Sequence, residues 1–185
     1  MTSIRHWHLA ACIILAGTSV PLAQKASAAT AAELNADGKA ALSRLYAQSP
    51  KAVKLGRSAT AILVFPKIVK AGLVVGGQGG EGVLLVRGKP TAYYKITAVS
   101  YGLQAGGQSF SYALFLMNDK ALNYLKKSDG WAIGSGPSVV VVDKGAAMST
   151  TSTTLAEDVY AFPFGQKGLM AGLGLEGSKI KAIKK

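Results

Sequence analysis

The chain is poor in the residues that catalysis and metal binding most often use. It has one cysteine and two histidines among 185 residues, and Cys12, His6 and His8 all lie in its first 12 positions. A chain that begins after residue 28 would contain neither type. Without imidazole, Ser-His-Asp and Cys-His catalysis lack their general base, and without His or Cys no ordinary zinc site or disulfide forms. We therefore predict no catalytic residues, no metal, no cofactor and no enzymatic activity.

Long hydrophobic runs are also scarce. Arg5 precedes one apolar run, Leu9 to Val20, and Ala26-Ser27-Ala28 offers small residues at a cleavage site. This pattern is typical of a secretory signal peptide over residues 1–28, because the run is short for a bilayer and no second stretch of about 18 apolar residues follows. A retained anchor and lipidation at Cys12 are the alternatives. We predict an exported protein, periplasmic or secreted, peripheral to a membrane.

Acidic residues are few, with nine Asp and Glu against 21 Lys and Arg. The net charge is +12, and loss of Arg5 and Lys25 with the signal peptide would leave +10. Such a charge favours anionic partners such as phospholipid headgroups, whereas a merely solvated surface is the alternative. Five cations fall within 20 residues with no acid between them: Lys51, Lys54, Arg57, Lys67 and Lys70. The first three are expected on one side of a short helix that starts at Ser49-Pro50.

The remaining pattern predicts helices at the start and one in the middle of a β-rich chain. Residues 29–48 have apolar residues at helical spacing, and Asn118 is a suitable cap for a helix over 119–127. Short apolar runs separated by turn residues every 8 to 12 positions indicate strands, among them a buried one over 137–143 and a polar edge over 149–154. Trp131 is expected in the core. The predicted fold class is α+β, mainly an antiparallel β sandwich or barrel-like sheet with two or three peripheral helices.

The stretch 61–85 is the centre of this pattern. An apolar run ends at Phe65-Pro66, where proline cannot donate to a sheet ladder, and a glycine-rich segment leads to a second apolar run, Val83 to Val86. Glycines in strands mark bulges, bends or close backbone approaches. The stretch therefore predicts a strand, a short connection carrying Lys67 and Lys70, a glycine-kinked strand, a turn and another strand, which is buried.

Three blocks of the sequence resemble the SYLF domain family, which is found in bacterial exported proteins and in fungal and animal proteins tied to phosphoinositides and cortical actin. The blocks are Val64-Phe65-Pro66 with Lys70-Ala71-Gly72, Gly76-Gly77 and Gly80-Glu81-Gly82; Gly102 to Ser109; and Gly165 to Ala171 with Leu175-Glu176-Gly177. The resemblance covers roughly Pro50 to Ile183 and implies a SYLF-type domain over 49–185. This domain follows the predicted signal peptide over 1–28 and the predicted N-terminal helix over 29–48. It also implies that Lys167 occupies a basic position that could contact phosphate.

Other interpretations of the same residues are weaker. Residues 77–82 and 172–177 both satisfy G-x-G-x-x-G, but a strand-like segment follows each one, where a dinucleotide site needs a helix. Nucleic-acid binding is not expected, because the chain is predicted to be exported and lacks interleaved aromatic and basic residues. Glu81 and Glu176 could form a glycosidase-like carboxylate pair, or each could simply accept structural hydrogen bonds.

We therefore predict a non-enzymatic lipid-binding module that associates with anionic phospholipid, with phosphoinositide-like headgroups implied by the resemblance. The expected lipid-binding residues are Lys51, Lys54, Arg57, Lys67, Lys70 and Lys167. The alternative is a structural or protein-interaction domain of the actin-binding type. It would act on a protein partner or a second copy through strand pairing at the polar edge over 149–154.

Overall fold

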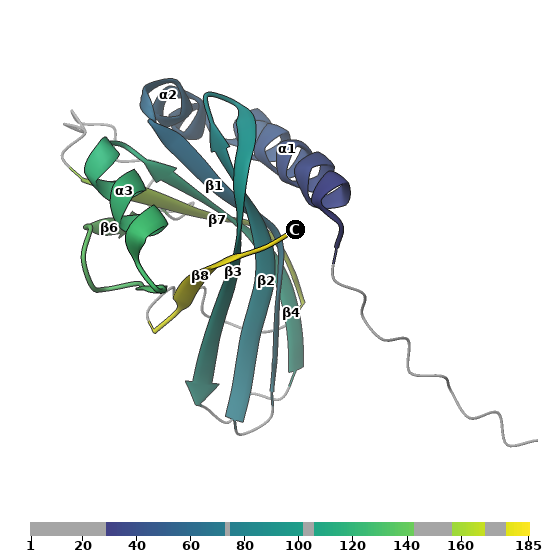
Figure 1. Ribbon diagram of the computed structural model, residues 1–185. Helices are drawn as coiled ribbons and strands as arrows, with labels where there is room; N and C mark the ends of the chain where they lie inside the picture. The colour runs from purple at the N-terminus through teal and green to yellow at the C-terminus, as the bar shows by residue number, and fades with distance from the viewer. Residues whose placement is uncertain (1–28, 73–74, 102–105, 143–156, 169–176) are drawn as a thin grey trace, which may run out of the picture.

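The protein forms one curled sheet with helices on both sides (Figure 1). The computed structural model describes residues 29–72, 75–101, 106–142, 157–168 and 177–185. Its elements are α1 (Ala31–Gln48), α2 (Pro50–Ser58), β1 (Ala61–Gly72), β2 (Val75–Val86), β3 (Lys89–Tyr101), β4 (Gly106–Leu116), α3 (Asp119–Lys127), β5 (Trp131–Ala132), β6 (Val139–Val141), β7 (Val159–Gly168) and β8 (Lys179–Ile183). The strand order is β5-β8-β3-β2-β1-β4-β7-β6, and all neighbours are antiparallel except β6 and β7. The predicted α+β class, dominated by antiparallel strands, is confirmed.

Each face of the sheet carries its own apolar core. On the α1 face, leucines of α1 and α2 pack on strand residues that include Val64, Val83 and Phe115. On the α3 face, α3 and Trp131 pack on the alternate strand residues, among them Phe65 and Leu114. Because successive side chains of a strand point to opposite faces, the continuous apolar run that opens β1 is buried on both sides. Burial of each large apolar side chain contributes about 1.5 to 3 kcal/mol.

Helix α1 is fixed at its start and in its middle by local chemistry. The Thr30 hydroxyl accepts a hydrogen bond from the Glu33 N–H at 3.2 Å, and the Glu33 carboxylate accepts one from the Thr30 N–H at 2.8 Å. These bonds form a capping box, and the Thr30 hydroxyl also donates to the Glu33 carboxylate at 2.8 Å. The bonds from the Thr30 N–H and the Thr30 hydroxyl lower the pKa of Glu33. Gly38 faces the sheet, where an added Cβ would collide with a methyl group of Val83. The glycine weakens the helix by about 1 kcal/mol but lets α1 lie close against β2.

The structure confirms some predicted details and corrects one. Ser49 and Asn118 cap α2 and α3 as expected, and Trp131 is fully buried. Residues 137–143 were expected to form a buried strand, but only Val139–Val141 is a strand, at the edge of the sheet, with Val140 39% and Val141 41% exposed. The prediction was wrong because an edge strand can be strongly apolar without a covering layer. The polar edge expected over 149–154 lies outside the described residues.

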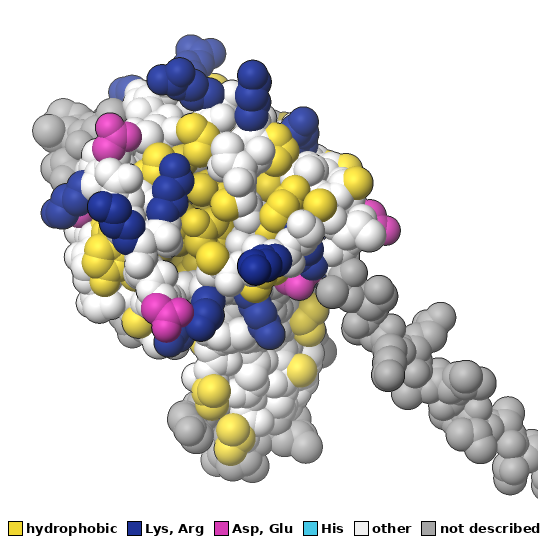
Figure 2. Space-filling view, in the orientation of Figure 1, with side chains coloured by type: hydrophobic (Ala, Val, Ile, Leu, Met, Phe, Trp, Pro, Cys, Tyr) yellow, Lys and Arg dark blue, Asp and Glu magenta, His cyan; other side chains and the backbone are white. Residues whose placement is uncertain are grey.

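Four strands extend past the helices as a stalk (Figure 1). We define the stalk as residues 68–72, 75–80, 96–101 and 106–109, from β1, β2, β3 and β4. Lys and Arg side chains gather over α2 and the β2–β3 hairpin, while the far end of the stalk shows no charged side chain on the visible face (Figure 2). Within the described ranges, no helix is both long and apolar enough to cross a bilayer.

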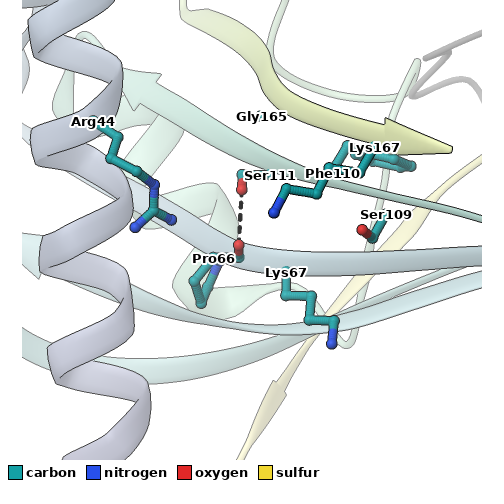
Figure 3. A pocket seen from close by; sticks show the side chains of 8 residues that line it. All are labelled: Arg44, Pro66, Lys67, Ser109, Phe110, Ser111, Gly165 and Lys167. Atoms are coloured by element: carbon teal, nitrogen blue, oxygen red, sulfur yellow. Dashed lines mark hydrogen bonds between the residues drawn. The ribbon is translucent and has the colours of Figure 1, made fainter.

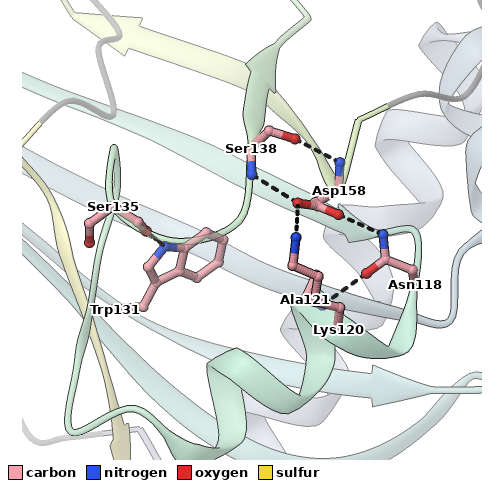
Figure 4. A network of polar contacts seen from close by, with 7 residues as sticks. All are labelled: Asn118, Lys120, Ala121, Trp131, Ser135, Ser138 and Asp158. Atoms are coloured by element: carbon pink, nitrogen blue, oxygen red, sulfur yellow. Dashed lines mark hydrogen bonds and ion pairs between the residues drawn. The ribbon is translucent and has the colours of Figure 1, made fainter.

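A polar network around Asp158 joins α3 to strands β6 and β7 (Figure 4). The Asp158 carboxylate accepts hydrogen bonds from the Asn118 side-chain amide at 2.8 Å and the Ser138 N–H at 3.1 Å, and Lys120 lies 3.6 Å away. Asn118 also caps α3 by accepting from the Ala121 N–H at 2.9 Å. The bonds from Asn118 and Ser138, followed by the charge of Lys120, lower the pKa of Asp158.

Replacing Asp158→Asn is expected to lower the free energy of unfolding by about 1 kcal/mol at neutral pH, because two hydrogen bonds lose their charged acceptor. A carboxyl group whose pKa is lowered by folding stabilises the protein above its unfolded pKa, and this contribution is lost as the pH falls through the folded value. Urea unfolding should therefore separate the two proteins at pH 6, and the difference should shrink as the pH falls from about 4 through the lower folded pKa of Asp158. A difference that does not change with pH would contradict the assigned role of the charge.

Substitutions at two glycines of β2 should distinguish a glycine that packing requires from one that it does not. A Cβ on Gly82 would lie 2.5 Å from Phe65 Cδ1 and 2.7 Å from the Val64 carbonyl oxygen, so Gly82→Ala is expected to cost about 2 kcal/mol or more. A Cβ on Gly77 would lie 3.8 Å from its nearest neighbour, the Ala98 carbonyl oxygen, and Gly77→Ala should cost nothing measurable. Equal losses in urea unfolding would contradict this packing.

Candidate anion-binding site

A line of bulges crosses the sheet where the stalk begins. The pairing of β1 shifts register against β2 between Val64 and Lys67, and against β4 between Phe65 and Ile68. The pairing of β4 with β7 shifts between Ser109 and Ser111. Such bulges bend strands and redirect side chains, and they are frequent beside functional sites. Proline supplies the cause in β1, since it has no N–H for the ladder.

The bulge is held by one side-chain hydrogen bond. Ser111, which is buried, donates its hydroxyl to the Pro66 carbonyl oxygen at 2.7 Å. This bond satisfies a carbonyl group at the point where the ladder is interrupted. In β7, Gly165 takes a φ of +64°, a left-handed conformation that glycine adopts without strain. The irregular segments of β1, β4 and β7 therefore lie together and leave a hollow on the α1 face.

That hollow is an open pocket of about 670 Å³ with a cationic lining (Figure 3). Arg44 approaches it from α1, Lys67 from β1 and Lys167 from β7, and the Lys167 amino group reaches back toward Ser111. The full lining is Arg44, Pro66, Lys67, Ser109, Phe110, Ser111, Gly165 and Lys167. Three positive charges and the Ser109 hydroxyl thus surround the space, and the lining formed by the described residues contains no carboxylate.

The three cations have no acidic partner in the part of the chain that the structure describes. Glu81 is the cross-strand neighbour of Lys67, but its carboxylate lies 2.7 Å from the Lys185 amino group. Lys185 also donates to the Ala29 carbonyl oxygen at 2.6 Å, and its side chain is only 9% exposed. Glu81 therefore takes part in the contact that Lys185 makes with Ala29, and this contact holds the two ends of the domain together. The pocket keeps an uncompensated positive charge that an anion would neutralise.

Glu81 was given two interpretations, as one of a pair of catalytic carboxylates or as a structural hydrogen-bond acceptor. It accepts a lysine hydrogen bond, as the structural interpretation predicted. Glu176, its suggested catalytic partner, lies outside the described residues. Within the described ranges, no group of three or more His, Cys, Asp or Glu side chains could hold a metal ion.

The six predicted lipid-binding residues separate into three places. Lys67 and Lys167 line the pocket, on exposed side chains. Lys70 is on the α3 face, where its neighbours across the strands are the buried Gln78 and Gln108. Lys51, Lys54 and Arg57 lie on α2, whose buried residues are Ala52 and Leu55. Close spacing in sequence therefore did not mean one site.

Sequence reasoning missed Arg44, Ser109 and Ser111. Arg44 is near the end of α1, and only the tertiary packing of α1 on the sheet brings it to β1 and β7. The two serines flank Phe110 in β4 at the register shift against β7. A signal was present in Phe65-Pro66, because proline in a central strand demands a bulge. The residues opposite that bulge could not be identified without the pairing register.

These features define a class of protein, namely a curled antiparallel sheet domain with a cationic pocket at a line of bulges. The family model Ysc84, described as Las17-binding protein actin regulator, matches residues 97–185. This is the SYLF family, so the resemblance seen in the sequence is confirmed over these residues. The matched range includes Ser109, Ser111 and Lys167 of the pocket. No curated protein matches the chain.

Replacing Ser111→Ala should destabilise the protein by about 1 kcal/mol, because the Pro66 carbonyl oxygen loses its hydrogen-bond donor at the interruption of the strand ladder. The measurement is urea unfolding, with Ser109→Ala as the matched control, since the structure gives Ser109 no comparable bond. A Ser109→Ala variant that loses as much stability would show that the bulge does not depend on the Ser111 bond.

Proposed function

We propose that this protein is a non-enzymatic module that binds anionic phospholipid at a membrane surface, with the cationic pocket as its headgroup site. One observation carries the proposal: Arg44, Lys67 and Lys167 converge from three elements on a pocket whose lining has no acid. A phosphate group suits this chemistry, since guanidinium, ammonium and hydroxyl groups all donate hydrogen bonds to its oxygens.

The expected strength of the interaction is moderate. Each lysine or arginine near an anionic surface contributes about 1 kcal/mol, and the contribution falls as salt screens the charges. The pocket supplies three such groups. The α2 residues Lys51, Lys54 and Arg57 supply three more, on a separate part of the surface. Phosphoinositide-like headgroups are the finer proposal, and they rest on the family resemblance.

The proposal extends to chemistry and location. The pocket lining offers no carboxylate or imidazole to serve as a general base, which supports a binding role. Arg5, the apolar run from Leu9 to Val20 and the small residues at 26–28 support export. In an envelope compartment, the available partners would be the anionic phospholipids of the adjacent membrane.

A protein-interaction role is the second candidate. It is favoured by the description of the family model, which names a Las17-binding protein and actin regulator. It is also favoured by strand β6 at the sheet edge, where Val140 and Val141 are both about two-fifths exposed. Strand addition at such an edge is a common mode of peptide recognition. This role would be favoured if the protein is a monomer in solution, does not bind anionic vesicles and binds an extended peptide.

Charge reversal tests the headgroup site by co-sedimentation with neutral and anionic phospholipid vesicles at low and high salt. The pocket variant Arg44→Glu, Lys67→Glu, Lys167→Glu should bind anionic vesicles at least about tenfold more weakly than the wild type. The α2 variant Lys51→Glu, Lys54→Glu, Arg57→Glu should show a smaller loss.

A control variant carries the same change in charge elsewhere: Lys126→Glu, Lys127→Glu, Lys184→Glu, all at exposed positions. It should bind almost as well as the wild type at high salt, where long-range attraction is screened. If the pocket and control variants lose equal affinity, the protein has only a diffuse attraction to anions and the pocket is not its headgroup site.

A further inference from the structure

An exposed apolar surface continues from the cationic pocket along the stalk. Val69, Val75 and Val99 are 47%, 59% and 64% exposed, and the last two are the most exposed large apolar side chains in the described part of the chain. The pairing register places all three on the α1 face, because Val69 lies opposite Ser109 of the pocket and Gly77 lies opposite both Ala71 and Val99. We call this surface the stalk face. Its residues are Val69, Ala71, Val75, Gly77, Gly79, Thr97, Val99 and Gly107.

The glycines of the stalk face are not explained by the fold. An added Cβ would lie 3.8 Å from its nearest neighbour at Gly77 and 3.6 Å at Gly79, and would meet nothing within 4 Å at Gly107. None of the three has a positive φ. The glycines of the opposite face differ: a Cβ on Gly80 would lie 2.5 Å from the Lys67 carbonyl oxygen. Close packing against β1 explains why residue 80 is a glycine. At the stalk face, the space that a side chain would fill lies on the outer surface of the sheet and is empty in the structure.

Two properties of the stalk limit what can cover this face. Apart from the exposed Thr97, its members are apolar or lack side chains, so the occupant is apolar there. The face nevertheless adjoins a pocket with three cations that have no acidic partner among the described residues. A second copy of this chain would bring a second cationic pocket and the same net charge of +12 toward the first, which is unfavourable. An occupant with an anionic head and an apolar body would match both the cationic pocket and the apolar stalk face.

The stalk itself is unsuited to lie inside a bilayer. Strand β8 pairs with β3 only from Tyr93 to Thr97, so among the described residues β3 has no outer neighbour beyond Thr97. Open sheet edges do not occur in the hydrocarbon region, because their backbone groups would have no hydrogen-bond partner. Any hydrocarbon that covers the stalk face must therefore bind there outside the bilayer.

We propose that the stalk face binds the acyl chain of a single anionic amphiphile whose phosphate head lies in the cationic pocket. This inference rests on the proposed function and adds a hydrocarbon subsite to it. From Gly79 to Val75 the strand extends about 13 Å, close to the half-thickness of a bilayer's hydrocarbon core, about 15 Å. A flat face without Cβ atoms lets the chain lie directly on the backbone.

The test compares two soluble probes that share a head group: glycerol 3-phosphate, and a mono-acyl glycerol 3-phosphate kept below its critical micelle concentration. Binding to the full chain is measured by NMR titration at low salt. We expect the acyl chain to tighten binding at least about tenfold, since each buried methylene contributes substantially. A spin label at the end of the chain should broaden the methyl signals of Val69 and Val99.

Three variants locate the effect. Gly77→Val fills the face and should abolish the gain that the acyl chain gives, while glycerol 3-phosphate binds as before. Val69→Gln with Val99→Gln should reduce the gain about fivefold or more. The matched control, Val140→Gln with Val141→Gln, changes two exposed valines of β6 and should leave the gain unchanged.

The outcomes separate the two proposals. If glycerol 3-phosphate binds and the acyl chain adds nothing, or if the gain survives in Gly77→Val, the hydrocarbon subsite is overturned and the headgroup site stands. If neither probe binds the wild type, both proposals fall. If sedimentation shows a wild-type dimer that Gly77→Val converts to monomer, the stalk face is a subunit interface and the acyl-chain inference is overturned.

Discussion

The interruption of the central strand at Pro66 is the constraint on which the rest of this structure depends. The first half of strand β1 is buried on both faces, and β1 pairs with β2 and β4 before and after Pro66, so a residue without an N–H forces a register shift on each neighbour. The shift continues through Ser111 into β7. It separates a body covered by helices from an uncovered stalk, and it leaves the pocket at the boundary.

Glycine serves two different purposes on the two faces beyond that boundary. On the α3 face, Gly80 and Gly82 give room to Ile68, Phe65 and the backbone of β1, so that the strands can cross closely. On the α1 face, Gly77 and Gly107 give room to nothing inside the molecule. Both sets alternate along the same strands, because the period of a strand is two residues. A single glycine-rich sequence thus serves internal packing and an external surface together.

The sequence predicted the elements better than their arrangement. The caps Ser49 and Asn118, and a strand at the start of β1, follow from local chemistry and were predicted. The connection predicted after Pro66 was wrong, because β1 continues through a bulge to Gly72. The pocket required the register of β4 against β7 and the packing of α1, which no local pattern specifies. For the same reason Lys67 and Lys70 were grouped together, although the bulge and the alternation of the strand place them on opposite faces.

The pairing of Glu81 explains why the pocket remains positively charged. Glu81 has Lys67 and Lys95 as neighbours across the strands, so it could neutralise either one. Its carboxylate instead lies against the mostly buried Lys185, at a contact that also holds the Ala29 carbonyl oxygen. An ion pair that is shielded from water is worth more than an exposed one, provided its hydrogen bonds are made. The same carboxylate that fastens the ends of the domain therefore leaves Lys67 available to an external anion.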